Sequence, residues 1–90
     1  MPDWKMISFI SSSEPRFKIL LHLSKTASTP SLISKELKIP LSRVSVILKE
    51  LEEKELIECL TKNVRKGKFF RTTDKGIEVI NDIHDLTNVK

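Results

Sequence analysis

The sequence predicts one mainly α-helical domain of the α+β class, with a three-helix core, a β-hairpin and a C-terminal helix. Three observations support this fold class. Apolar residues recur at the 3.6-residue period of a helix along several stretches of the chain. A basic turn containing Gly67 separates two short runs of strand-forming residues. The length of 90 residues fits a single domain, and the sequence shows no internal repeat.

Residues 14–25 form the first helix of the predicted core. Ser13 is the expected N-cap, and Glu14 and Pro15 lie in the first turn. Apolar side chains wrap more than half of this helix, so it should lie at the centre of the core or be shared with another subunit.

Residues 30–51 predict two short amphipathic helices joined by a tight turn, which is a helix-turn-helix. Thr29 is the expected N-cap of the first, and Pro30 takes a position where its missing N–H costs nothing. This helix is expected to bury Leu32, Ile33 and Leu37. Isolated helices below roughly 12–15 residues are marginal in water, so neighbouring elements must support the pair.

The second helix of the pair, residues 41–54, has two distinct sides. The apolar side should face the core, and it consists of Val44, Ile47, Leu48 and Leu51. The opposite side and its flanks should face a partner or water, and they consist of Ser42, Arg43, Ser45, Val46, Lys49, Glu50 and Glu53.

A β-hairpin follows, with arms at about residues 57–62 and 68–73 and with Gly67 free to take a positive φ in the turn. Leu60 and Phe70 are the expected buried side chains, and Phe69 points the other way. A slip of one residue would exchange Phe69 and Phe70. A two-stranded hairpin is marginal alone and must pack on the helices.

The last predicted helix covers residues 74–86, with Thr73 as its N-cap. Gly76 in its first turn costs about 1 kcal/mol relative to alanine, so the backbone of another element is expected to pass close by. The apolar face of this helix and an N-terminal arm, residues 1–12, exceed what a domain of residues 13–90 can bury. The surplus predicts a homodimer formed through Trp4, Ile7, Phe9, Ile10, Phe17, Ile83 and Leu86.

Charge and composition favour an anionic partner and argue against a membrane-spanning or secreted protein. The formal net charge is +4, which agrees with an anionic partner. Between Cys59 and Thr73 there is no acidic residue and there are five basic ones, Lys62, Arg65, Lys66, Lys68 and Arg71. No apolar run is long enough to span a membrane and no secretory signal is visible, so a cytoplasmic location is expected. The single cysteine, Cys59, is expected to be a buried strand thiol.

Two strings of sequence carry a family resemblance. Residues 29–57, TPSLISKELKIPLSRVSVILKELEEKELI, resemble the helix-turn-helix and first strand of bacterial and archaeal MarR-like and ArsR-like transcriptional regulators. Residues 69–80, FFRTTDKGIEVI, are similar to the strand and helix start that close the wing in those families. The match covers about residues 13–86 and implies a winged helix-turn-helix of the small archaeal type. It also implies double-stranded DNA as the partner.

Three positions depart from the family pattern. Lys38 stands where the turn often has glycine, so either it adopts a left-handed conformation at about 1 kcal/mol or the turn differs. Glu55 stands where a helix-terminating glycine is common. Val46 is apolar on the side where the family usually places a polar residue, which predicts sparse hydrogen bonding to bases.

The resemblance places the second helix in the major groove and the wing on phosphates or in the minor groove. The expected DNA contacts are Ser42, Arg43, Ser45, Val46 and Lys49 on the helix and Lys62, Arg65, Lys66, Lys68 and Arg71 on the wing. The competing interpretations are a solvated helix face and a hairpin whose charges only prevent edge pairing.

Other functions find less support in the residues. Metal sensing by ArsR-like proteins needs clustered ligands, whereas Cys59, His22 and His84 lie on different predicted elements, so no metal site or other cofactor is expected. No catalytic triad, phosphate-binding loop or paired carboxylate motif stands out, so an enzyme is not expected. The main alternative is a winged helix that binds protein in a transcription or replication assembly, which Leu41 and Val46 favour.

Overall fold

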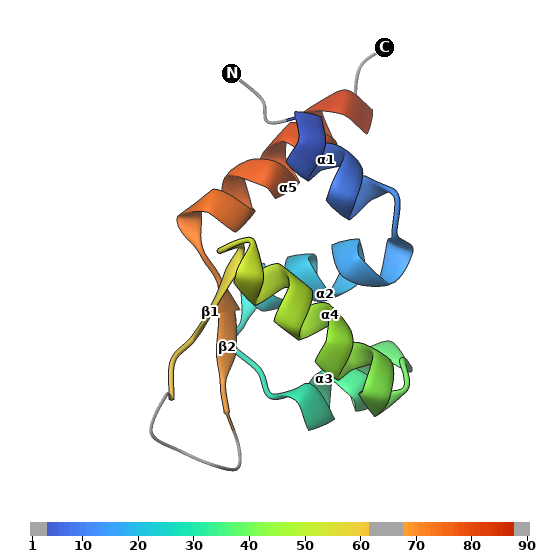
Figure 1. Cartoon of the computed structure of the whole chain (residues 1–90), viewed down its shortest axis with the longest axis vertical. Helices are drawn as coiled ribbons and strands as arrows, with labels where there is room; N and C mark the ends of the chain where they lie inside the picture. The colour runs from blue at the N-terminus through green and yellow to red at the C-terminus, as the bar shows by residue number, and fades with distance from the viewer. Residues whose placement is uncertain (1–3, 62–67, 88–90) are drawn as a thin grey trace.

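The computed structural model describes residues 4–61 and 68–87, which form five helices and a two-stranded antiparallel sheet (Figure 1). In chain order the elements are α1 (Trp4–Ser11), α2 (Glu14–Lys25), α3 (Pro30–Leu37), α4 (Leu41–Glu53), β1 (Ile57–Cys59), β2 (Phe70–Thr72) and α5 (Asp74–Thr87). The predicted α+β class and element order are confirmed, although both strands are shorter than expected. None of the described helices combines the length and the apolar character needed to cross a membrane.

Helices α2, α3 and α4 form the centre of the core. Their fully buried side chains include Ile19 and Leu20 on α2, Ile33 on α3, and Val44 and Leu51 on α4. The predicted N-cap of α3 is confirmed, because the Leu32 N–H donates to Thr29 Oγ1 at 3.3 Å. The prediction that Leu32 is buried is wrong. Its side chain is exposed, and Leu37 is only half-buried.

The N-terminal helix α1 belongs to the same core and does not extend as a separate arm. It packs on α2 and α5 at the end of the molecule opposite α3 (Figure 1). Ile7 and Ile10 of α1 and Ile83 of α5 are at most 7% exposed within the single chain. These three residues are therefore not free to form the predicted dimer interface, because α1 already covers the apolar face of α5.

Two residues without glycine's freedom adopt left-handed backbone conformations at helix ends. Lys38 has φ 57° and ψ 42° in the turn after α3, and Glu55 has φ 62° after α4. The Leu56 N–H donates to the Leu51 carbonyl at 3.0 Å, which closes the end of α4 as a glycine-type cap would. Lys38 and Glu55 thus take a conformation that glycine adopts without steric penalty, and each costs about 1–2 kcal/mol there.

The hairpin packs one face against the helices. Ile57 pairs with Thr72 and Cys59 pairs with Phe70, and these side chains are buried or half-buried. Leu60 was expected on this face but is exposed. The alternation that begins with Ile57 turns odd-numbered residues of β1 inward, so Leu60 falls on the other side. Phe69 is exposed and Phe70 is buried, as predicted.

The start of α5 is held tightly against the hairpin. Thr73 Oγ1 accepts the Gly76 N–H at 3.2 Å, which confirms Thr73 as the N-cap. A Cβ atom at Gly76 would overlap the Leu56 carbonyl oxygen and the Thr72 methyl group. The close backbone approach that the sequence predicts at Gly76 is thereby confirmed.

Candidate nucleic-acid interface

The outward side of α4 is open to solvent. All five residues predicted on it, Ser42, Arg43, Ser45, Val46 and Lys49, are exposed. Val46 lies at the centre of this side and is 59% exposed. The opposite side of the same helix packs in the core through Val44, Ile47, Leu48 and Leu51. The amphipathic pattern therefore orients α4 as the sequence predicts.

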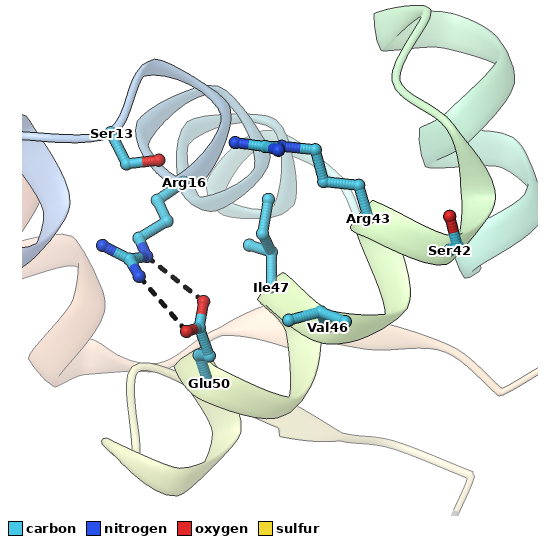
Figure 2. A pocket seen from close by; sticks show the side chains of 7 residues that line it. All are labelled: Ser13, Arg16, Ser42, Arg43, Val46, Ile47 and Glu50. Atoms are coloured by element: carbon cyan, nitrogen blue, oxygen red, sulfur yellow. Dashed lines mark hydrogen bonds and ion pairs between the residues drawn. The ribbon is translucent and has the colours of Figure 1, made fainter.

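An open cleft runs along one flank of α4 (Figure 2). It has a volume of about 420 Å³ and is lined by Ser13, Arg16, Ser42, Arg43, Val46, Ile47 and Glu50. The Arg43 side chain extends past Ile47 toward α2, where Ser13 and Arg16 lie (Figure 2). The cleft therefore brings cationic side chains from α2 and α4 to the same edge of the exposed helix face.

Arg16 of α2 lines this cleft and forms hydrogen bonds to α1 and α4. Its Nε and Nη2 atoms donate to Oε1 and Oε2 of Glu50 on α4, each at 3.2 Å. Its Nη1 donates to the Phe9 carbonyl oxygen on α1 at 3.1 Å, and its Cζ lies 4.1 Å from the centre of the Phe9 ring. The sequence did not reveal this cluster, because Arg16 and Glu50 are 34 positions apart and no local pattern pairs them.

The hairpin contributes Lys68 and Arg71 among the described residues, and both are exposed. Arg71 Nε donates to Glu58 Oε2 on the neighbouring strand at 3.1 Å, so its charge is partly compensated. Lys62, Arg65 and Lys66 lie outside the described residues. β1 packs against α4 and β2 packs against α2, and the hairpin extends toward the end of the molecule where α3 lies (Figure 1).

The candidate metal ligands His22, Cys59 and His84 do not form a metal-binding cluster among the described residues. Among residues 4–61 and 68–87, no group of three His, Cys, Asp or Glu side chains is placed to hold an ion. His22 on α2 lies with Nε2 3.8 Å from Glu36 Oε2 on α3, and that nitrogen is buried without a hydrogen-bond partner. Cys59 is half-buried, whereas the sequence predicted a buried thiol.

Comparison with solved structures identifies similar folds. ZitR from Lactococcus lactis, a zinc-responsive MarR family member, is 30% identical with a TM-score of 0.69, and the match covers 83% of this chain and 55% of that chain. Wild-type ZitR in complex with DNA is 29% identical with a TM-score of 0.69, over 79% of this chain and 49% of that chain. The chain thus spans about half the length of these structures.

A mutant of MarR from E. coli, complexed with operator DNA, has a TM-score of 0.75 at 22% identity, over 93% of this chain and 64% of that chain. This likeness concerns the fold alone. No curated protein matches the sequence. The family model described as winged helix-turn-helix matches residues 11–90, which is most of the chain. The chain therefore belongs to the winged helix-turn-helix family and has a MarR-like fold.

Proposed function

We propose that the chain binds double-stranded DNA as a transcriptional regulator, with α4 in the major groove and the hairpin on the phosphate backbone. The observation that carries this proposal is the exposed side of α4, which presents Arg43, Lys49 and two serines beside a basic hairpin. Two proteins of similar structure, ZitR and MarR, have been solved with DNA. An α-helix fits the major groove, and phosphate contacts dominate affinity.

The residues of α4 suit different parts of a DNA site. The Arg43 guanidinium has the geometry to donate two hydrogen bonds to guanine, and Val46 can contact a thymine methyl group. Ser42 and Ser45 can bond a base edge or a phosphate, and Lys49 lies one turn further along for a phosphate. Because the exposed Val46 is apolar, hydrogen bonds to bases are expected to be few on this side.

The dependence of affinity on salt tests this proposal. Two subunits that each neutralise roughly four phosphates should give a slope of log K against log[salt] near −7, since each phosphate contributes about −0.9. The measurement is fluorescence anisotropy on a labelled duplex at several salt concentrations, with binding sites first selected from random duplexes. A slope near zero, or no binding at low salt, would contradict DNA as the partner.

A protein-binding role is the second candidate, and a specific observation favours it. Leu32, Leu41 and Val46 are large apolar residues exposed on the helix-turn-helix. These are the apolar side chains of the helix-turn-helix that a protein partner would bury. In that case the affinity for the partner would respond to Val46→Ser and Leu41→Ser and would hardly change with salt.

The proposed regulator acts as a homodimer, formed through the exposed apolar residues near the termini. Trp4 on α1 is 59% exposed and Leu86 on α5 is 46% exposed, and Phe9 and Phe17 are half-buried. A two-fold dimer would present its recognition helices to successive major grooves about 34 Å apart.

Replacing both Trp4 and Leu86 with serine should raise the dimer dissociation constant at least tenfold, because losing a central aromatic anchor costs on the order of 2 kcal/mol. Sedimentation velocity at several concentrations measures the change. Leu32→Ser is the matched control, since Leu32 is similarly exposed but lies on α3. If the unmodified chain sediments as a monomer at every concentration, the proposed interface does not exist.

A further inference from the structure

We propose that Arg16 is a positioning residue of the DNA-binding surface, because its guanidinium holds and neutralises the Glu50 carboxylate beside the exposed side of α4. This inference rests on the proposed DNA-binding function and deepens it. It concerns a residue on α2, outside the helix-turn-helix and the hairpin. Among the described residues, Arg16 makes three side-chain hydrogen bonds, two to Glu50 and one to the Phe9 carbonyl.

The guanidinium of Arg16 uses each of its three nitrogens. Nε and Nη2 form a two-pronged pair with the Glu50 carboxylate, both distances being 3.2 Å, and Nη1 donates to the Phe9 carbonyl at 3.1 Å. The Phe9 ring stacks near the same group, with Arg16 Cζ 4.1 Å from its centre. A planar group held in this way has little rotational freedom. It therefore holds the Glu50 carboxylate in one place beside the exposed side of α4.

The position of Glu50 explains why it needs a partner. At about 100° per residue, Glu50 lies about 40° round α4 from Val46, on the flank of the exposed side that meets Arg16 of α2. It lines the same cleft as Arg43 and Val46 (Figure 2). An unpaired carboxylate at this place would repel the phosphates that Arg43 and Lys49 attract.

The burial of the pair makes the neutralisation effective. The side chain of Arg16 is 23% exposed and that of Glu50 is 36% exposed, so both are partly withdrawn from water. Charges attract more strongly where water is partly excluded, and a two-pronged pair adds a fixed geometry. With Glu50 neutralised, Arg43 and Lys49 are the charged side chains that remain unpaired among the described contacts on the first three turns of α4.

Arg16→Gln tests the inference, because it removes the charge and keeps a shorter, polar side chain. The substitution should weaken duplex binding roughly three- to tenfold at about 0.1 M salt, the range for one unit charge within a screening length of several phosphates. Glu50→Gln alone should bind at least as tightly as the unmodified chain. The double variant Arg16→Gln, Glu50→Gln should regain an affinity within about twofold of the unmodified chain, because the unmasked carboxylate is gone.

Lys18→Gln is the matched control. Lys18 lies on the same helix, two residues from Arg16 and so on its far side, and bonds Glu14 at 2.9 Å. The substitution removes the same charge from α2 and should leave DNA affinity unchanged within about twofold, because Lys18 is exposed and salt screens its charge from the opposite side of the helix. Circular dichroism and thermal melting of every variant check that the fold is intact at the assay temperature.

The outcomes separate the inference from the function on which it rests. If the double variant binds as weakly as Arg16→Gln, then Arg16 contacts phosphate itself or only supports the fold, and the masking of Glu50 is overturned. If Arg16→Gln binds the duplex as tightly as the unmodified chain, the masking of Glu50 is also overturned. If the unmodified chain itself fails to bind any duplex at low salt, the proposed function fails, and this inference fails with it.

Discussion

Gly76→Ala is expected to lower the free energy of unfolding by about 3 kcal/mol, at the upper end of the range for overpacking a tight site. The added methyl group would overlap the Leu56 carbonyl oxygen, which accepts the Thr73 N–H at 2.9 Å and so cannot move without breaking that bond. The Thr72 methyl group on the other side is held as well, because Thr72 Oγ1 donates to the Leu20 carbonyl at 2.7 Å.

Urea unfolding followed by circular dichroism measures this effect. Two opposing contributions decide its sign, because alanine is favoured over glycine inside a helix by about 1 kcal/mol, whereas the overlap costs more. Lys75→Ala is the control, since Lys75 is exposed at the preceding position and its replacement should change stability by no more than about 0.5 kcal/mol. A Gly76→Ala variant as stable as the unmodified chain would mean that α5 does not approach Leu56 closely.

Reversing the charge of Arg43 or Lys49 is expected to abolish most of the DNA affinity. Each substitution to glutamate removes an attraction and adds a repulsion on the exposed side of α4, which changes the local charge by two. Loss of a two-pronged contact to a base costs about 1–3 kcal/mol, and a dimer carries the change twice. We expect Arg43→Glu to weaken binding by on the order of a hundredfold or more.

Competition binding with the selected site and with a random duplex separates the two residues. Lys49→Glu should weaken both duplexes alike if Lys49 contacts phosphate, whereas Arg43→Glu should weaken the selected site more, because base contacts carry specificity. Lys18→Glu, on the far side of α2, makes the same change of charge and serves as control. If it weakened binding as much as Arg43→Glu, net charge alone would explain the affinity and α4 would not be the reading element.

Local patterns predicted much of this fold because they reflect interactions within a few residues. Thr29 and Thr73 cap helices with their own hydroxyl groups, and the spacing of Val44, Ile47 and Leu51 defines one side of α4. Glycine destabilises the first turn of a helix relative to alanine, and a close approach of another backbone segment explains its presence at position 76. This role could therefore be predicted from the sequence. The exposed residues of the candidate site follow from the same helical period.

Features set by contacts distant in sequence were missed. The place of Ile7 and Ile10 in the core depends on α5, whose apolar face they cover, and no pattern within the first dozen residues distinguishes this from a dimer contact. Leu60 was assigned to the wrong face because an inward Ile57 fixes the alternation, and burial of Ile57 depends on its packing with the helices. The pairing of Arg16 with Glu50 likewise exists only after α2 and α4 have packed.

A backbone contact joins the α2–α3 connection to β2, and it does not depend on the identity of any side chain. Ser28 and Phe70 exchange two hydrogen bonds, Ser28 N–H to the Phe70 carbonyl at 3.0 Å and Phe70 N–H to the Ser28 carbonyl at 2.8 Å. Main-chain groups make this link, so it tolerates replacement of nearby side chains. Substitutions on the exposed side of α4 can therefore change what this chain binds without breaking the link that holds β2 beside the α2–α3 connection.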